Sequence, residues 1–286
     1  MNRPEIKFVG VVVKPDVGEA WATAAEVSSW FKARGIKTFT EKDNHESKIE
    51  TVSREVFKEN ADLIVVLGGD ETMIPTARLT GSREVPVLGI NYGSLGYLTD
   101  FRIEEMRDAL TAILEGNYEI DRRVMLDVEH LRGEQILETG RILNDVVINR
   151  AVLAKIIEVE ITLNDLYVNS FRADGMIVAT PTGSTAYSLS AGGPIVYPSM
   201  NAVVLTPVCP FTLTNRPIVI PDAAEIKLKL KSKSEGVMLT LDGQVGYQMQ
   251  PEDCVRIRKS ATSFNLVQPP NRNYFDVLRN KLKWGR

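Results

Sequence analysis

Apolar residues in the first part of the chain alternate between short continuous runs and stretches with helical spacing. Residues 6–13 and 63–67 are almost wholly apolar and rich in β-branched residues, which is typical of strands buried on both faces. Between them an apolar stripe recurs every three or four residues, which predicts a helix that ends at a glycine. The stripe consists of Ala20, Ala24, Val27 and Phe31, and Gly35 follows it.

Three further segments extend this alternation. Residues 87–90 predict another parallel strand, and residues 103–115 predict a helix closed by Gly116. A helix is also expected over about residues 72–79, with its start set back by a residue or two because Pro75 favours the first helical turn. Alternating strands and helices predict an α/β domain with an open, mostly parallel sheet.

Beyond about residue 124 the apolar pattern changes to a period of two. Residues 156–163 alternate, and Asn164-Asp165 supplies a turn before residues 166–170, which predicts a hairpin with one face in solvent. Residues 226–230 and 255–258 alternate in the same way. The second half is therefore expected to be a predominantly antiparallel β domain.

The C-terminal tail returns to helical spacing. Phe275, Leu278 and Leu282 share one helical face, which predicts a C-terminal helix that packs back on the first domain. The expected parts are the α/β domain over residues 1–120, the β domain over residues 121–270 and the tail over residues 271–286.

Charge and hydropathy exclude several partners. The 286 residues include 34 basic and 37 acidic side chains, a net charge of −3, whereas sequence-independent nucleic-acid binding needs clustered Lys and Arg. No apolar run reaches the roughly 20 residues of a membrane helix, and the N-terminal apolar patch is too short for a secretory signal. We therefore expect no nucleic-acid partner, no membrane association and a cytoplasmic protein with Cys209 and Cys254 as reduced thiols.

Several common nucleotide-binding and catalytic motifs are missing. The sequence has no GxxxxGK[ST] P-loop, and Gly93 and Gly96 lack the third glycine of a Rossmann GxGxxG fingerprint. His45 and His130 lie far apart in unlike contexts, so neither a zinc site nor a Ser-His-Asp triad is indicated and no metal ligand is assigned. Ser184 lies in TGSTA and has no candidate base, which argues against a serine nucleophile.

The most informative motif is Gly68-Gly69-Asp70-Glu71-Thr72, between a predicted buried strand and a predicted helix. Glycines there let backbone N–H groups approach an anion, and a helix start favours negative charge. An acid does not neutralise phosphates, so Asp70 would hold a metal ion or accept a proton from an attacking hydroxyl. The alternative is that Asp70 or Thr72 only caps the helix. The residues alone leave both open.

Three other elements carry polar side chains beside predicted strands. Asn144-Asp145 precedes an apolar run and suits the hydroxyls of a ribose, although taken alone it is better explained as a turn at a strand edge. Residues 174–194 form a strand and a loop dense in small hydroxyl residues, which can press its backbone against a flat base. Asp242-Gly243-Gln244, taken alone, is a hairpin turn.

Together these motifs resemble the NAD kinase family. GGDxT is shared with diacylglycerol-type lipid kinases and phosphofructokinases, whereas the loop from Thr180 to Pro194 is specific to the NAD kinases. The resemblance spans about residues 6–280. The motifs occur in the family's order, as GGDxT at 68–72, NxGxLGYL at 91–98, LNDVV at 143–147, the whole stretch 174–194 and DGQ at 242–244.

The resemblance implies a nucleotide site between an α/β and a β domain. It implies transfer of the γ-phosphoryl group of ATP, or of inorganic polyphosphate, to the 2′-hydroxyl of the adenosine ribose of NAD. It also implies a divalent cation, Mg²⁺ or Mn²⁺, and a homodimer or homotetramer in which neighbouring subunits complete the site. Asp70 matches the proposed general base, and Gly68, Gly69 and Thr72 match the phosphate-donor loop. Positions that match the dinucleotide site are Asp70, Glu71, Asn144, Asp145, Lys155, Arg172, Asp174, Thr185, Ala186, Tyr187, Ser188, Leu189, Ser190 and Gln244.

One position departs from the family's GGDG motif. Glu71 replaces a glycine and adds bulk and negative charge where the family brings its backbone close to phosphates. At a positive φ it would also cost about 1 kcal/mol or more. Three outcomes are open: the side chain turns to solvent, helps to hold Mg²⁺, or weakens donor binding. Because Asp70 and the rest of the site are intact, we expect retained kinase activity with altered donor affinity.

Two other functions remain open. A kinase that acts on a lipid or another small alcohol would share GGDxT, but its substrate site should show a wider apolar groove. An NAD-binding protein that has lost its phosphate-donor side through Glu71 would bind NAD and form no NADP. An assay of NADP formation separates these possibilities.

Overall fold

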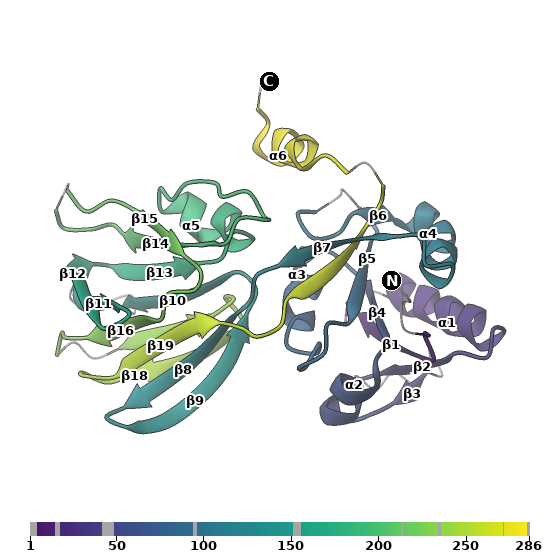
Figure 1. Ribbon diagram of the computed structural model, residues 1–286, viewed down its shortest axis with the longest axis horizontal. Helices are drawn as coiled ribbons and strands as arrows, with labels where there is room; N and C mark the ends of the chain where they lie inside the picture. The colour runs from purple at the N-terminus through teal and green to yellow at the C-terminus, as the bar shows by residue number, and fades with distance from the viewer. Residues whose placement is uncertain are drawn as a thin grey trace. The chain divides into compact units, whose positions relative to one another are not determined.

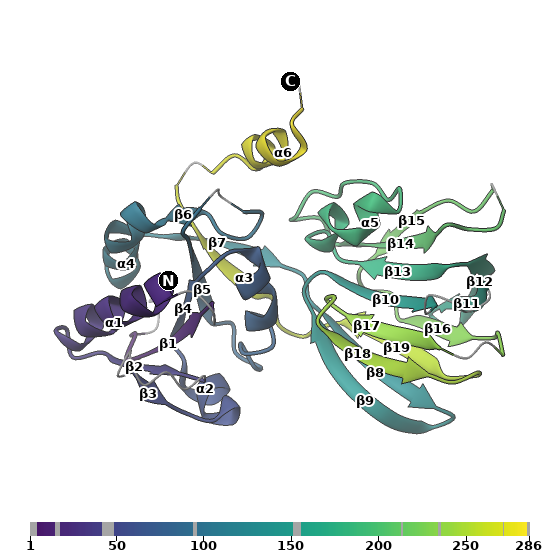
Figure 2. The ribbon, with the colours of Figure 1, turned by 180° about the vertical axis from the view of Figure 1, so that it is seen from behind.

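The structure is a computed structural model, and it describes residues 5–14, 18–41, 49–93, 96–150, 156–212, 214–233, 236–270 and 272–284. The chain divides into two compact units, of which one comprises residues 1–122 and 264–286 and the other residues 123–263. Figures 1 and 2 show the ribbon from two sides. Residues 264–270, which the sequence assigned to the β domain, group with the first unit because they include a strand of its sheet.

The first unit is built on an eight-stranded, mostly parallel sheet, as predicted. The strand order is β3-β2-β1-β4-β5-β20-β7, and β6 also pairs with β5. All pairs recorded among β1 to β6, and the pair of β5 with β20, are parallel. The strands are β1 (Phe8–Val13), β2 (Lys37–Thr40), β3 (Glu50–Thr51), β4 (Leu63–Leu67), β5 (Pro86–Asn91), β6 (Phe101–Arg102), β7 (Glu119–Arg123) and β20 (Phe264–Gln268).

Helices cover both faces of this sheet (Figure 1). α1 (Gly18–Lys32) and α4 (Met106–Leu114), which follows the 3₁₀ turn η1 (Ile103–Glu105), share one apolar cluster with Val9 and Val11. Side chains alternate across a strand, so the other face belongs to α2 (Arg54–Asn60) and α3 (Asp70–Thr76). There a Cβ added at Gly10 would lie 2.3 Å from the Phe57 ring of α2. Within the described residues, no helix has the length and apolar character needed to cross a membrane.

The predicted C-terminal helix is present as α6 (Tyr274–Leu282). The side chain of Asn273 caps it by accepting a hydrogen bond from the N–H of Phe275 at 3.0 Å. The helix buries Tyr274 and Leu278, whereas Phe275 is 52% exposed. The prediction that Phe275 belongs to the packed face is therefore wrong, because Tyr274, four residues before Leu278, takes that position.

The second unit contains two six-stranded antiparallel sheets. Their strand orders are β15-β14-β13-β10-β17-β18 and β12-β11-β16-β19-β8-β9. The first sheet comprises β10 (Asp145–Arg150), β13 (Gly175–Ala179), β14 (Ala202–Val208), β15 (Ile218–Pro221), β17 (Val237–Leu241) and β18 (Val245–Met249). The second comprises β8 (Leu126–Arg132), β9 (Gln135–Ile142), β11 (Ile157–Leu163), β12 (Leu166–Ala173), β16 (Ile226–Leu230) and β19 (Cys254–Lys259). Cys209 and Cys254 are free thiols in this unit.

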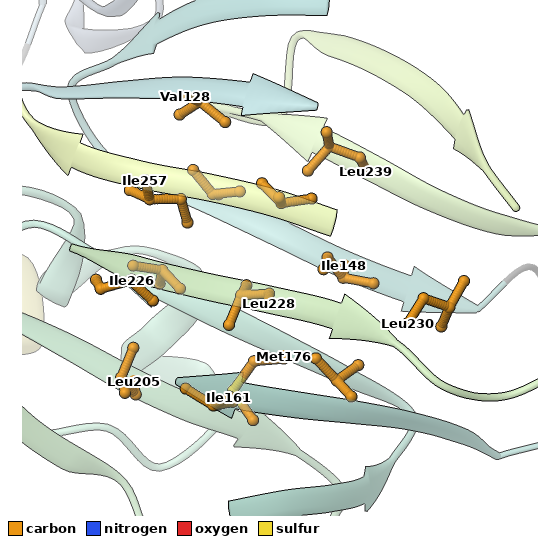
Figure 3. Close-up of a cluster of buried hydrophobic side chains, with 14 of the residues drawn as sticks. Val128, Ile148, Ile161, Met176, Leu205, Ile226, Leu228, Leu230, Leu239 and Ile257 are labelled. Carbon is orange, nitrogen blue, oxygen red and sulfur yellow. The ribbon is translucent and has the colours of Figure 1, made fainter. Parts of the chain in front are cut away.

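The core of the second unit lies between these sheets. Alternate residues of both sheets meet in one cluster, in which Ile148 and Met176 of one sheet lie opposite Ile161 and Leu228 of the other (Figure 3). The predicted hairpin of β11 and β12 is confirmed, with its turn at Asn164-Asp165, where φ is 49° and 65°. Positive φ at both central residues is the geometry of a tight hairpin turn.

The sheet that contains β13 is apolar on its other face as well. Ile177 and Ala179 of β13 form a second buried cluster there with Val196. Val196 belongs to the segment 180–196, which includes the 3₁₀ turn η2 (Gly183–Thr185) and the short helix α5 (Tyr187–Ser190). The Ser184 hydroxyl fixes this segment, because it donates to the Pro181 carbonyl at 2.7 Å and accepts from the Val196 N–H at 3.0 Å. The hydroxyl-rich loop is thus held against the end of a central strand.

Candidate functional site

The Gly68–Thr72 motif follows the fully buried strand β4 and forms the start of α3. Gly69 is the N-cap of this helix, and no side chain caps it, so capping does not explain Asp70 or Thr72. The helix spans Asp70–Thr76 and not about residues 72–79 as predicted. Pro75 lies inside it and lacks the N–H that would pair with the fourth carbonyl before it, and the helix ends one residue later.

The carboxylate of Asp70 is held by a neighbouring loop of the same unit. Oδ2 accepts a hydrogen bond from the N–H of Tyr97 at 2.8 Å, and Oδ1 accepts from the N–H of Leu98 at 3.0 Å. A Cβ added at Gly96 would lie 2.0 Å from Oδ1. The motifs GGDxT and NxGxLGYL therefore meet at this acid. Asp70 is half-buried, so its carboxylate is fixed in place but not enclosed in the core.

Glu71 turns outward from the same helix. Its carboxylate forms an ion pair with Lys14, which directly follows β1. Glu71 lies in the first turn of α3 and is not among the residues with positive φ, so the backbone strain considered for this position does not arise. A cavity of about 480 Å³ beside the pair is also lined by Arg54 and Arg78. The Glu71 side chain therefore lies at the surface and pairs with Lys14. This corresponds to the first of the three outcomes considered from the sequence, a side chain turned to solvent.

In the second unit, Asn144-Asp145 leads into a central strand. Residues 143–144 form a bend at the edge of β10, whose first residue is Asp145, and β10 lies between β13 and β17 in the interior of its sheet. The Asn144 carbonyl accepts a hydrogen bond from the N–H of Thr180 at 2.9 Å. Gly183 packs on the same carbonyl, and a Cβ there would lie 2.1 Å from the oxygen. The dipeptide and the hydroxyl-rich loop are therefore in direct contact.

Asp145 and Asp242 form a buried pair of acids. The turn between β17 and β18 was predicted from Asp242-Gly243-Gln244 and is present, but Asp242 is only 8% exposed. Its carboxylate accepts hydrogen bonds from the backbone of residues 143–145. Burial first, and the charge of Asp242 second, raise the pKa of Asp145 to about 7. The sequence marked Asp242-Gly243-Gln244 as a motif of the resemblance but did not indicate a buried carboxylate there, since Asp-Gly is common in hairpin turns.

The predicted residues of the loop differ in exposure. Ser188 is buried, and its hydroxyl lies 2.9 Å from the hydroxyl of Thr206. Thr185 is half-buried and donates to the Thr182 carbonyl at 3.2 Å. The remaining predicted residues of this part are half-buried or exposed at the surface of the unit, namely Ala186, Tyr187, Leu189, Ser190 and, in the β17–β18 turn, Gln244.

Arg172 and Asp174 lie at the other end of β13. Thr180 follows this strand and Asp174 precedes it, so they are separated by six residues, or about 20 Å of extended chain. The guanidinium of Arg172 lies 5.3 Å from the centre of the Phe211 ring, and Asp174 Oδ1 pairs with Arg150 Nε at 2.8 Å. The predicted dinucleotide residues of this unit therefore do not form one cluster. Lys155 lies outside the described residues.

Side chains that commonly ligate metals are dispersed in the described part of the chain. It contains no group of three or more His, Cys, Asp or Glu side chains that could hold a metal ion. Mg²⁺ commonly uses one or two carboxylates together with water and substrate phosphates. The described carboxylates therefore fit a cation that arrives bound to a phosphate donor.

Comparison with known proteins identifies the family. The model described as the ATP-NAD kinase N-terminal domain matches residues 9–118, and the model of the ATP-NAD kinase C-terminal domain matches residues 143–269. The NAD kinase of Geotalea daltonii is 47% identical over 282 residues, which cover 98% of this chain and 99% of that relative. The chain belongs to the NAD kinase family.

Other members of the NAD kinase family support the same assignment. The NAD kinase of Geobacter metallireducens is 44% identical over 98% of this chain and 99% of its own length. A crystal structure of an NAD kinase from Archaeoglobus fulgidus in complex with ATP aligns with a TM-score of 0.73 at 27% identity, over 96% of this chain and 98% of that one. Yeast NADH kinase complexed with NADH aligns with a TM-score of 0.89 at 23% identity, over 99% and 89%, and shows the shared fold.

Proposed function

We propose that this chain phosphorylates NAD at the 2′-hydroxyl of the adenosine ribose with ATP as the donor, and that Asp70 is the general base. The observation that carries the proposal is the match of both NAD kinase domain models, at 9–118 and 143–269, to one chain. Relatives named NAD kinase match it over nearly their full length, and one related NAD kinase has been crystallised with ATP.

The fixed carboxylate of Asp70 supports its role as base. Transition states for phosphoryl transfer are loose, so positioning and charge neutralisation provide most of the acceleration. Two backbone N–H groups, of Tyr97 and Leu98, hold the carboxylate in one orientation, and their geometry does not depend on a flexible side chain. A carboxylate is a weak base, but the hydroxyl proton leaves late in such a reaction, and a weak base suffices.

The second unit supplies groups suited to the dinucleotide. We propose that Asn144 and Asp145 bind ribose hydroxyls, and that Thr185 to Ser190 and Gln244 lie along the rest of the ligand. With a pKa of about 7, the Asp145 carboxyl is present in both protonation states near neutral pH and can donate or accept. Arg172 and Asp174, at the far end of β13, fit a site completed by a neighbouring subunit in a homodimer or homotetramer. Light scattering after size exclusion tests that assembly.

The divalent cation is proposed to enter as part of the donor. Mg²⁺ or Mn²⁺ on ATP, or on polyphosphate, would neutralise the phosphate charge, which fits the lack of a three-residue metal cluster in the described residues. The donor loop of Gly68, Gly69 and Thr72 lies directly beside Asp70. We also propose a cytoplasmic location, which localisation of a tagged full-length chain tests.

The decisive experiment measures NADP formation from NAD with ATP or polyphosphate, with Mg²⁺ or Mn²⁺. Asp70→Asn should lower kcat at least a hundredfold, as is typical when a general base is lost, while the Kd for NAD measured by calorimetry stays within a few-fold. Asp276→Asn, at an exposed position on α6, is the control and should match the parent. Full activity in Asp70→Asn would remove that residue from its role. A parent that binds NAD but forms no NADP from any donor would contradict the kinase assignment.

A further inference from the structure

Asp242 lies in a hairpin turn, but its carboxylate is buried, as the carboxylate of a functional residue often is. It adopts a φ of 52° between β17 and β18, where aspartate usually faces water. Instead it is 8% exposed, whereas the next two residues of the turn, Gly243 and Gln244, are exposed. A buried carboxylate is tolerated only where hydrogen bonds replace its hydration.

Those hydrogen bonds come from three successive backbone amides. Oδ1 accepts from the N–H of Asn144 at 2.7 Å and of Asp145 at 3.2 Å, and Oδ2 accepts from the N–H of Leu143 at 3.1 Å. The Asp242 N–H in turn donates to the Asp145 carbonyl at 2.9 Å. Hydrogen bonds to an ionised acceptor are roughly twice as strong as neutral ones, so this carboxylate fixes the backbone on one side of the dipeptide.

The hydroxyl-rich loop fixes the other side. The Asn144 carbonyl accepts from the N–H of Thr180 at 2.9 Å, and the Thr180 hydroxyl donates to the Leu143 carbonyl at 2.5 Å. Gly183 packs so closely on Asn144 that an added Cβ would lie 2.1 Å from its carbonyl oxygen. The two N–H groups of the dipeptide and the Asp145 carbonyl are thus held by Asp242, whereas the Asn144 carbonyl is held by the hydroxyl-rich loop. Both elements carry predicted dinucleotide residues.

We infer that Asp242 is a positioning residue of the dinucleotide site, which holds Asn144 and Asp145 in the conformation that binds ribose hydroxyls. The inference rests on the proposed function, since it assigns Asp242 a task in NAD binding. Asp242 acts through the backbone and is not proposed to touch the substrate.

The charge of Asp242 has an effect that a purely structural residue would not have, namely on the pKa of Asp145. It contributes to the raised pKa of Asp145. Among the described neighbours of Asp145, the paired strands β13 and β17 and the residues 180–183 carry no titratable side chain that would oppose this charge. Arg123, the last residue of β7, donates to the Thr182 hydroxyl of that segment at 3.3 Å. Removing the charge of Asp242 should therefore lower the pKa of Asp145.

The test is the isosteric variant Asp242→Asn. We expect the KM and the calorimetric Kd for NAD to rise at least tenfold, with a smaller change in kcat at saturating NAD. The pH dependence of NAD binding should also move to lower pH. The control is Asp165→Asn, because Asp165 is likewise a hairpin-turn aspartate with positive φ but is exposed. It should change neither the affinity nor the pH dependence.

An unchanged Kd and pH dependence in Asp242→Asn would overturn the inference, even if thermal stability falls. Should the variant not fold, hydrogen exchange in the unmodified chain decides. The amides of residues 143–145 should be protected, and saturating NAD should slow the exchange of all three further; exchange that NAD leaves unchanged would overturn the inference. Both readouts use NAD binding, so they remain valid if the parent forms no NADP and only the proposed kinase activity fails.

Discussion

Asp145 should destabilise the protein at neutral and alkaline pH, and Asp145→Asn should relieve that cost. Its pKa is raised from 3.8 to about 7 in the folded chain, first by burial and then by the charge of Asp242. The folded state therefore holds a proton on Asp145 that the unfolded state has already released. Above about pH 7 both states are ionised, and the folded state bears the full cost of a buried charge.

The size of the effect follows from the pKa difference. The change from 3.8 to about 7 is about 3 pKa units, which corresponds to about 4 kcal/mol at 1.36 kcal/mol per unit. Below about pH 4 the carboxyl is protonated in both states and the cost vanishes. Asparagine has the same shape and no charge. The stability of the variant relative to the parent should therefore increase between pH 4 and pH 7 by up to about 4 kcal/mol.

Urea unfolding followed by far-UV circular dichroism at pH 5, 6, 7 and 8 measures this difference. Asp165→Asn is the control whose difference from the parent should not change between pH 5 and pH 8, because the hydrogen bond and ion pair with Lys227 lower the pKa of Asp165 and its carboxylate is ionised in both states over that range. Any stabilisation from Asp165 is present above its unfolded pKa and is lost as the pH falls through the lower folded value. If the difference between Asp145→Asn and the parent is the same at pH 5 and pH 8, the buried-charge explanation is refuted.

Three further substitutions test the surroundings of Asp70 in the first unit and of Asn144 in the second unit. Gly96→Ala should lower kcat at least tenfold with a small change in melting temperature, because its Cβ would displace the carboxylate 2.0 Å away; Gly93→Ala, whose nearest atom is 3.9 Å away, should match the parent in the same NADP assay. Glu71→Gly should change kcat less than a hundredfold at saturating NAD, because Glu71 is already drawn away to Lys14; a larger gain would mean that the parent is impaired. Gly183→Ala should destabilise the fold by about 3 kcal/mol and raise the KM for NAD, because its Cβ would lie 2.1 Å from a backbone carbonyl oxygen; an unchanged unfolding midpoint would contradict this.

The fold could be predicted where one periodicity dominates. β4 coincides with the predicted strand 63–67, and β16 coincides with 226–230, because buried parallel strands and half-buried antiparallel strands have distinct patterns. The pairing of β20 with β5 could not be predicted, since a single short apolar run does not reveal which sheet it joins. Pro75 misled the prediction of α3 because proline preference is a statistical tendency, and the contacts of Asp70 with the loop at 97–98 fix the helix start instead.

The two acids of the candidate site, Asp70 and Asp242, differ in how far the sequence reveals their roles. Asp70 was recognisable because glycines surround it and a buried strand precedes it, all within five residues of chain. The hydrogen-bonding task of Asp242 was not, although DGQ is one of the motifs of the resemblance, because its partners at 143–145 lie about a hundred residues away and contribute only backbone N–H groups, which every residue type but proline carries. A side chain that works through the backbone leaves no pattern in its partners' identities. The burial of a turn aspartate reveals this task, and burial becomes visible only when the chain is folded.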